Sequence, residues 1–235
     1  MTELQLDKRM KCIADCVPDG AILADIGTDH GKLPVYLAMK GRIKRAVAAD
    51  INEMPLQKAV NNIKKHGLTD VIETCLTDGL KGIEKFTPDC VVIAGMGGEL
   101  IEQILEESTL PKGGVKYVLQ PMTKEDSLSR YLCKNGYVIT DEHIVFEGKL
   151  YRIICAEYTG EITQMTESMH YLGRKNIEKG GEMLIALTEK VLERTEVKIA
   201  GRRMAGLDVT EEKALLAELQ EIKFRHFEKK EGETL

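Results

Sequence analysis

The sequence predicts an α/β fold in which a doubly wound, mostly parallel sheet is followed by a separate pair of helices. Five short apolar runs alternate with helix-like segments through the first 135 residues. This alternation is typical of a parallel sheet with helices on both faces. Two more strand-like runs, 137–146 and 150–158, are joined by Glu147-Gly148-Lys149 and predict a closing hairpin. After Gly160 the strand signal almost disappears.

The composition is that of an ordinary globular protein with one large domain, or with a domain and an appendage. Of the 235 residues, 43% are hydrophobic and 30% are charged. No apolar run approaches the roughly 18 residues of a membrane span, and the N-terminus has no signal-peptide core. We therefore expect a cytoplasmic protein with no membrane partner. The net charge of −5 means that any nucleic-acid partner would need a local basic patch.

The six cysteines predict reduced thiols rather than a metal site. Cys75, Cys90 and Cys155 lie inside apolar, strand-like runs, which predicts buried thiols in a reducing compartment. Cys12 and Cys16 lie one helical turn apart, but no nearby cysteine or histidine pair completes a zinc site. We therefore expect no metal.

The strands and helices of the first part follow in chain order. The parallel strands are predicted at 22–26, 45–50, 71–76, 90–94 and 116–120. Helices are predicted at 3–17, from 33, at 55–66, from 98 to about 107, and at about 124–135. Turn residues mark several of these boundaries. Pro18-Asp19-Gly20 ends the first helix, Pro55 opens the third, and Gly67 and Asn135-Gly136 stop two others.

The last part predicts an antiparallel helical hairpin, with domains at 1–160 and 161–235. Two long helices are expected, at about 168–203 and 209–229. Apolar residues recur at heptad-like spacing, which favours a coiled coil, at Ile177, Leu184 and Val191 and at Leu215, Leu219, Ile222 and His226. Met204 to Asp208 forms the turn, and Thr210 begins the second helix with a capping pattern.

The two predicted helices carry opposite charge. Residues 170–203 contain eight Lys or Arg against five Glu, and 204–235 contain five Lys or Arg against eight acids. The charges either hold two solvated helices in register or contact phosphates, and the two interpretations are compatible. The candidate phosphate ligands are Arg174, Lys175, Lys179, Arg194, Lys198, Arg202 and Arg203.

Acids and glycines gather at the carboxyl ends of four predicted strands, where Asp25, Asp50, Asp78 and Gly95 fall. In parallel sheets, ligands bind at this edge. An acid at a single strand end is commonly only a turn former. Four such ends in a row favour a binding site.

The loop after the first strand indicates which ligand this is. Glycine at Gly27 and Gly31 lets the backbone approach a ligand, and the next helix offers free N–H groups. In the dinucleotide fingerprint a glycine stands at the position of Asp29. Carboxylates at Asp25 and Asp29 would repel a pyrophosphate and attract an ammonium cation such as that of S-adenosylmethionine. The alternative is an ordinary turn with solvated acids.

Each strand end can take a part of that cofactor. Asp50 would accept from the ribose hydroxyls, Asp78 from the adenine amino group, and Asp25 or Asp29 would pair with the ammonium. Predicted cofactor contacts are Asp25, Gly27, Thr28, Asp29, His30, Asp50, Ile51, Asp78, Gly79 and Gly95. The pocket for the methyl acceptor is predicted to be lined by Asp29, Met96 and Gln120, and no catalytic base is assigned.

Three motifs resemble the bacterial tRNA adenine-22 N1-methyltransferases, a family of class I S-adenosylmethionine-dependent enzymes. They are Ala24-Asp25-Ile26-Gly27-Thr28-Asp29-His30, Ile93-Ala94-Gly95-Met96-Gly97-Gly98 and Leu119-Gln120-Pro121. The resemblance covers nearly the whole chain. It implies a Rossmann-like methyltransferase domain, a C-terminal helical hairpin as a tRNA-binding arm, and tRNA as substrate. Lys32 stands where the family usually has an aromatic residue, and Asp50 where Glu is common.

Other functions remain open at the level of sequence. A nicotinamide-dependent oxidoreductase is disfavoured by Asp29 and by the missing third fingerprint glycine. A methyltransferase acting on a small molecule or a protein is a second alternative. A non-catalytic cofactor-binding scaffold that docks through its helical hairpin is a third. The sequence does not determine the oligomeric state, and a monomer is one option.

Overall fold

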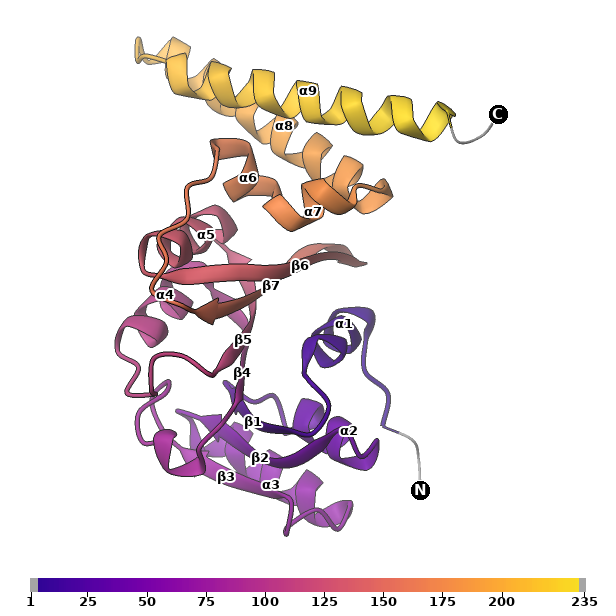
Figure 1. Cartoon of the computed structure of the whole chain (residues 1–235), viewed down its shortest axis with the longest axis vertical. Helices are drawn as coiled ribbons and strands as arrows, with labels where there is room; N and C mark the ends of the chain where they lie inside the picture. The colour runs from indigo at the N-terminus through magenta and orange to yellow at the C-terminus, as the bar shows by residue number, and fades with distance from the viewer. Residues whose placement is uncertain (1–3, 233–235) are drawn as a thin grey trace. The chain divides into compact units, whose positions relative to one another are not determined.

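In the computed structural model, a seven-stranded sheet with the order β3-β2-β1-β4-β5-β7-β6 forms the centre of the first compact unit of the chain, Met1–Thr163 (Figure 1). The structure describes the backbone of residues 4–232 and the side chains of residues 4–226. Strands β1 to β5 are parallel, and β7 runs antiparallel to both β5 and β6. The strands span Ala21–Ile26 (β1), Ile43–Asp50 (β2), Ile72–Leu76 (β3), Cys90–Gly97 (β4), Lys116–Thr123 (β5), Tyr137–Glu147 (β6) and Lys149–Tyr158 (β7).

Helices cover both faces of this sheet (Figure 1). They are α1 (Lys8–Cys16), α2 (Lys32–Met39), α3 (Glu53–Lys65), α4 (Gly98–Glu106) and α5 (Glu125–Lys134), with a short 3-10 helix at Glu84–Phe86. Buried Ile13, Leu33 and Ile63 place α1, α2 and α3 in the apolar core on one face. Ile101 and Leu128 place α4 and α5 in the core on the other. The predicted doubly wound α/β class is confirmed.

The central strands are apolar throughout because both of their faces are covered. In β4, Val91, Val92 and Ile93 are all fully buried, as expected for a parallel strand between two helical layers. β1 pairs with β2 on one side and with β4 on the other. The order therefore reverses between β1 and β4, and such a switch point opens a crevice at the carboxyl ends of the strands.

β4 and β5 extend further than the sequence predicted. The Gly95 to Gly97 stretch, expected as a loop, continues β4, and β5 passes through Pro121 to Thr123. The register between these strands shifts around Gly95, which has a φ of +81° that favours glycine. This irregularity at the strand end bends β4 beside the crevice.

The chain divides into two compact units, Met1–Thr163 and Gln164–Leu235. The second contains α6 (Glu167–Leu172), α7 (Arg174–Lys179), α8 (Glu182–Met204) and α9 (Thr210–Gly232). The single helix predicted at 168–203 is wrong, because Gly173 and then Gly180-Gly181 interrupt it. All three glycines have positive φ values, of 91°, 70° and 95°, which a helix does not allow.

α8 and α9 pack side by side as an antiparallel pair. Their buried apolar residues include Leu184, Leu187, Val191 and Ile199 on α8 and Leu215, Leu219 and Ile222 on α9. Two ion pairs link the helices, Glu189–Lys223 (2.8 Å) and Lys198–Glu212 (3.0 Å). The acid is on α8 in the first pair and on α9 in the second. That opposite charges fix the register stays an interpretation, and in the first pair the acid lies on the basic helix. Coiled-coil geometry stays a prediction, and Ile177 lies in α7, outside the long pair.

Within the described residues, the structure contains no helix that is both long and apolar enough to cross a membrane.

Candidate functional site

A cavity of about 450 Å³ opens at the switch point between β1 and β4. Its walls come from the ends of these strands, the start of α2 and the segment that leads into α1. The lining residues are Gln5, Leu6, Asp7, Arg9, Met10, Asp25, Gly27, Asp29, Lys32, Leu33, Ala94 and Gly95. Four of the predicted site residues, Asp25, Gly27, Asp29 and Gly95, thus meet at one cavity.

Asp25 is the buried carboxylate of this cavity. It is the last residue but one of β1 and is only 6% exposed. Burial raises the pKa of Asp25 to about 6, against the opposing effect of a 2.6 Å hydrogen bond from the Thr28 hydroxyl. Repulsion from Asp29 and Asp50 raises this pKa further. Such a group gains from a bound cation, which supplies the compensating charge that the fold does not.

Gly27 is required by the conformation of the loop. Its φ of +72° is left-handed, and a Cβ there would lie 2.1 Å from the Met96 side chain. The backbone N–H groups of Gly27 and Thr28 both donate to the Ala49 carbonyl, each at 2.9 Å. These contacts tie the loop to β2. Met96 packs behind the loop against the apolar core and is not among the cavity-lining residues described.

Asp29 carries the more exposed charge of the loop, with a side chain that is 69% exposed. Its carboxylate accepts a 2.8 Å hydrogen bond from Lys32, and its other oxygen lies 3.5 Å from Nε2 of His30. The hydrogen bond from Lys32 lowers the pKa of Asp29. Lys32 therefore acts as a counter-cation from within the chain, at the position where an aromatic residue was expected.

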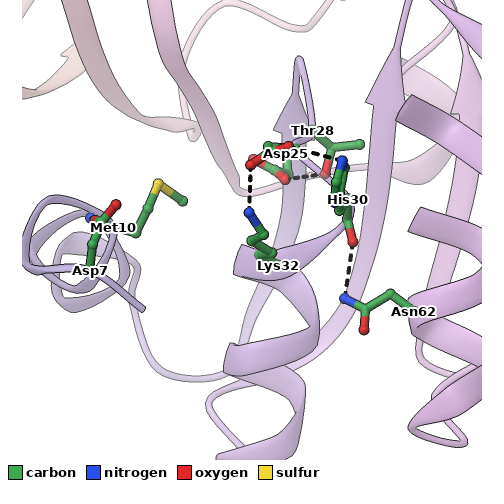
Figure 2. A network of polar contacts seen from close by, with 8 residues as sticks. Asp7, Met10, Asp25, Thr28, His30, Lys32 and Asn62 are labelled. Atoms are coloured by element: carbon green, nitrogen blue, oxygen red, sulfur yellow. Dashed lines mark hydrogen bonds and ion pairs between the residues drawn. The ribbon is translucent and has the colours of Figure 1, made fainter. Parts of the chain in front are cut away.

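His30 supports the loop through its backbone. Its backbone has a left-handed φ of 57°, and its carbonyl accepts a 3.0 Å hydrogen bond from Asn62 of α3 (Figure 2). This contact anchors the loop to the neighbouring helix. His30 is not among the described residues that line the cavity, so its predicted contact with the cofactor stays a prediction.

The other predicted cofactor residues lie at the ends of β2 and β3. Asp50 is half-buried, and its carboxylate accepts a 2.7 Å hydrogen bond from the Asn52 N–H. Ile51 beside it is 62% exposed. Asp78 pairs with Lys81 at 2.8 Å, and Asp78 and Gly79 line a separate, smaller hollow. The structure therefore brings the predicted residues to one sheet edge but does not join them into one cavity.

Comparison with known proteins gives this edge a family context. The model of the methyltransferase domain family matches residues 6–154. The tRNA (adenine(22)-N(1))-methyltransferase of Bacillus subtilis (strain 168) is 38% identical over 159 residues, which is 67% of each chain. The chain belongs to the tRNA (adenine(22)-N(1))-methyltransferase family.

Solved structures of this family share the whole fold. The tRNA methyltransferase TrmK of Bacillus subtilis has a TM-score of 0.78 at 30% identity, covering 96% of this chain and 99% of its own. A Streptococcus pneumoniae tRNA methyltransferase in complex with S-adenosyl-L-methionine also has a TM-score of 0.78, at 32% identity, covering 90% and 100% of the two chains. The resemblance seen in the sequence is confirmed.

Gln120 takes a different place in this tRNA methyltransferase from the one predicted. It is fully buried and is not among the described residues that line the cavity. Its Oε1 accepts a 2.6 Å hydrogen bond from Arg9, and its Nε2 donates to the Pro121 carbonyl at 2.7 Å. The amide is therefore engaged at both ends by the protein and holds Arg9 at the cavity wall.

The sequence did not predict that the N-terminal segment lines this cavity, although its basic residues Lys8, Arg9 and Lys11 were candidate phosphate contacts. Asp7 caps α1 by accepting a 2.7 Å hydrogen bond from the Met10 N–H, and both residues line the cavity (Figure 2). Arg9 lies over the Tyr151 ring, 5.5 Å from its centroid. Helical spacing predicts that this segment is a helix but does not say where it packs. The capping Asp7 was a signal for its start.

Proposed function

We propose that this protein transfers a methyl group from S-adenosylmethionine to N1 of adenine 22 in tRNA. The buried carboxylate of Asp25 carries the proposal, because its raised pKa marks a cation site where class I methyltransferases bind their cofactor. Membership in the tRNA (adenine(22)-N(1))-methyltransferase family supplies the substrate. Because that substrate is tRNA, the proposed location is the cytoplasm.

The residues of the sheet edge fit the cofactor. In this proposal Asp25 pairs with the methionine ammonium, and Asp29 adds a second negative charge once Lys32 moves aside. Asp50 accepts from the ribose hydroxyls, and Asp78 with Gly79 receives the adenine. When bound, S-adenosylmethionine supplies a methyl group on a positively charged sulfur. The acidic loop compensates that charge.

The chemistry requires positioning more than proton transfer. N1 of neutral adenine has a free lone pair, so no proton leaves it before it bonds to the methyl carbon. The carbon–sulfur bond breaks, and the positive charge passes from sulfur to the adenine ring. Asp25 and Asp29 can stabilise that cation through space. Alignment of the reacting atoms accounts for most of the rate enhancement in this proposal, and the irregular end of β4 at Ala94 and Gly95 lines the cavity where the acceptor would approach.

We further propose that the second unit, residues 164–235, holds the tRNA. Four of its candidate phosphate ligands already have acidic partners, since Arg174 and Lys175 pair with Glu178, and Lys198 and Arg202 with Glu212. Arg194 and Arg203 are exposed, with no such pair among the described side chains. We therefore regard these two as the first phosphate contacts. Exposed ion pairs are worth only about 0–1 kcal/mol, so phosphates can also displace Glu178.

The test is methyl transfer from labelled S-adenosylmethionine to bulk tRNA, followed by nucleoside analysis. We expect label in N1-methyladenosine. Label in another nucleoside would mean that the methyl group goes to a different atom of tRNA. Transfer to protein or small molecules, with none to tRNA, would contradict the proposal.

A further inference from the structure

Three metal-ligating side chains converge between α1 and the β6–β7 hairpin. They are Cys16 on α1, His143 on β6 and Cys155 on β7, and one ligand atom of each lies within 4.8 Å of the other two. Cys16 and Cys155 are buried and His143 is half-buried. None of the three is among the described residues that line the cavity. The cluster is therefore separate from the proposed cofactor site.

The register of the hairpin explains the convergence. Asp141 lies opposite Cys155, and His143 lies opposite Ile153. Residues directly opposite each other, and residues two apart on one strand, share a face of the sheet. Ile153 and Cys155 belong to the core that includes Ile13 of α1. The histidine and the strand cysteine thus face the helix that carries Cys16.

Cys12 is available as a fourth ligand. It lies one helical turn before Cys16 on the same face of α1, and its thiol is hydrogen-bonded to the Cys16 thiol. Together the side chains form a Cys₃His set, which is a common ligand set of structural zinc sites. Sequence spacing predicted no metal because the cysteine pair and its two partners are more than 120 residues apart in the chain.

We propose that Cys12, Cys16, His143 and Cys155 bind a structural zinc ion. Zinc bonds of about 2.0–2.3 Å in a tetrahedron place the ligand atoms roughly 3.5–3.8 Å apart. The ligand atoms of Cys16, His143 and Cys155, which lie within 4.8 Å of one another, therefore need to approach by only about 1 Å, and Cys12 would join them from its contact with Cys16. Each cysteine that binds the ion releases its proton to solvent and ligates as a thiolate. Four protein ligands leave no open position, which makes the site structural rather than catalytic.

Asp141 provides the outer partner that a ligating histidine requires. Its Oδ2 lies 3.2 Å from Nε2 of His143. Its Oδ1 accepts a 2.8 Å hydrogen bond from the Glu142 N–H, which fixes the carboxylate. A histidine that binds zinc through one nitrogen commonly donates its other N–H to a carboxylate. The group next to His143 is therefore of the expected type.

The ion would fasten a wall of the cavity. α1 carries Arg9 and Met10, which line the cavity, and Cys12 and Cys16 follow on the same helix. The ion would join these cysteines to His143 on β6 and Cys155 on β7, and it would thereby fix the helix against the sheet.

The test is metal analysis of the untagged, full-length protein together with Co²⁺ titration. We expect about one zinc per chain, and a near-ultraviolet thiolate-to-cobalt charge-transfer band when Co²⁺ replaces it. Cys12→Ser and His143→Gln change half-buried side chains, so these variants should fold, as circular dichroism can verify. Both should lose the band or bind far more weakly. Asp141→Asn should weaken Co²⁺ binding by about 10–100-fold.

Cys75→Ser is the matched control, because Cys75 is half-buried and lies on β3, outside the cluster. It should bind metal as the unchanged protein does. The proposal is overturned if the protein binds neither zinc nor cobalt stoichiometrically, or if Cys12→Ser and His143→Gln leave the cobalt spectrum unchanged. A disulfide among these cysteines in the protein purified under reducing conditions would also overturn it.

Discussion

At the scale of single residues, the buried charge of Asp25 has the most direct consequences. Burial raises the pKa of the Asp25 carboxyl to about 6. No lysine or arginine is among the described groups that shift this pKa. The S-adenosylmethionine ammonium would supply this missing charge. Asp25→Asn keeps the shape but removes the charge, and a charged hydrogen bond is worth about 1.5–3 kcal/mol. We expect cofactor affinity to fall roughly 10–150-fold in calorimetry, and an unchanged affinity would remove Asp25 from the site.

The same residue predicts a pH dependence of binding. Protonated Asp25 cannot pair with an ammonium, so affinity for S-adenosylmethionine should rise as pH increases through about 6. The Asp25→Asn variant should lack this rise. Calorimetric titrations at about pH 5 and about pH 7 compare the two proteins. A rise of equal size in both would assign the pH dependence to another group.

Asp25 also predicts the stability of the cofactor-free protein. Its folded pKa of about 6 lies above the unfolded value of about 3.9, so the folded state binds more protons between these values. The free energy of unfolding should therefore fall as pH rises from about 4 to 6, by at most about 3 kcal/mol. Asp25→Asn should be the more stable protein at neutral pH in urea denaturation. The reverse order would contradict the burial of an ionised Asp25.

At the scale of elements, the junction of β4 and α4 depends on glycine. A Cβ on Gly98 would lie 2.4 Å from the Lys124 carbonyl oxygen, whereas one on Gly97 would meet the Thr123 hydroxyl at 3.3 Å. Gly98→Ala should destabilise the protein by about 1–3 kcal/mol through this clash with backbone. Gly97→Ala is the matched control and should cost less in thermal unfolding. Equal stability of Gly98→Ala and the unchanged protein would show that the backbone at Lys124, between β5 and α5, can shift away from Gly98.

The sequence predicted most elements of the first unit because its strands are buried on both faces and its helices keep an apolar face. It failed where conformation depends on distant contacts. The heptad of Ile177, Leu184 and Val191 continued across Gly180-Gly181, so spacing alone predicted one helix. A Cβ at Gly180 would lie 2.8 Å from the His226 ring, and this contact cannot be seen from local sequence.

For the candidate site residues, too, the sequence did not predict contacts between residues that are distant in the chain. Asp25, Gly27, Asp29 and Gly95 follow strands directly, so the rule for parallel sheets places them together at the cavity. Arg9 reaches the site through a bond to Gln120, which is 111 residues away in the chain. The spacing of residues in the sequence does not predict that Arg9 and Gln120 pair.

At the scale of the whole molecule, the two units suggest a division of labour. The N–H of Thr163 donates to the Cys133 carbonyl, so a truncation should retain Thr163 rather than end at the predicted boundary of 160. We expect residues 1–163 to bind S-adenosylmethionine like the full chain and to methylate tRNA poorly. Calorimetry and methyl-transfer assays of both proteins measure this. Full tRNA activity of the truncated protein would make the second unit dispensable.

A net-acidic protein can still hold a polyanion, because the Debye length is only about 8 Å at physiological salt. Arg194→Glu with Arg203→Glu should raise the KM for tRNA. The slope of log binding constant against log salt concentration should become shallower by roughly 0.7–0.9 per lost phosphate contact. Affinity for S-adenosylmethionine should not change. Lys213→Glu, on the acidic helix α9, is the charge-matched control for each of the two reversals made singly. An equal effect of the control would indicate overall charge rather than a binding face.

The most direct test of the proposed function uses one tRNA transcript and a second in which adenine 22 is replaced by guanine. The unchanged protein and Asp25→Asn are compared under single-turnover conditions with labelled S-adenosylmethionine. The proposed function predicts label in N1-methyladenosine of the first transcript alone, with a slower reaction for Asp25→Asn at limiting cofactor. Equal labelling of the two transcripts, or none in either, would contradict it.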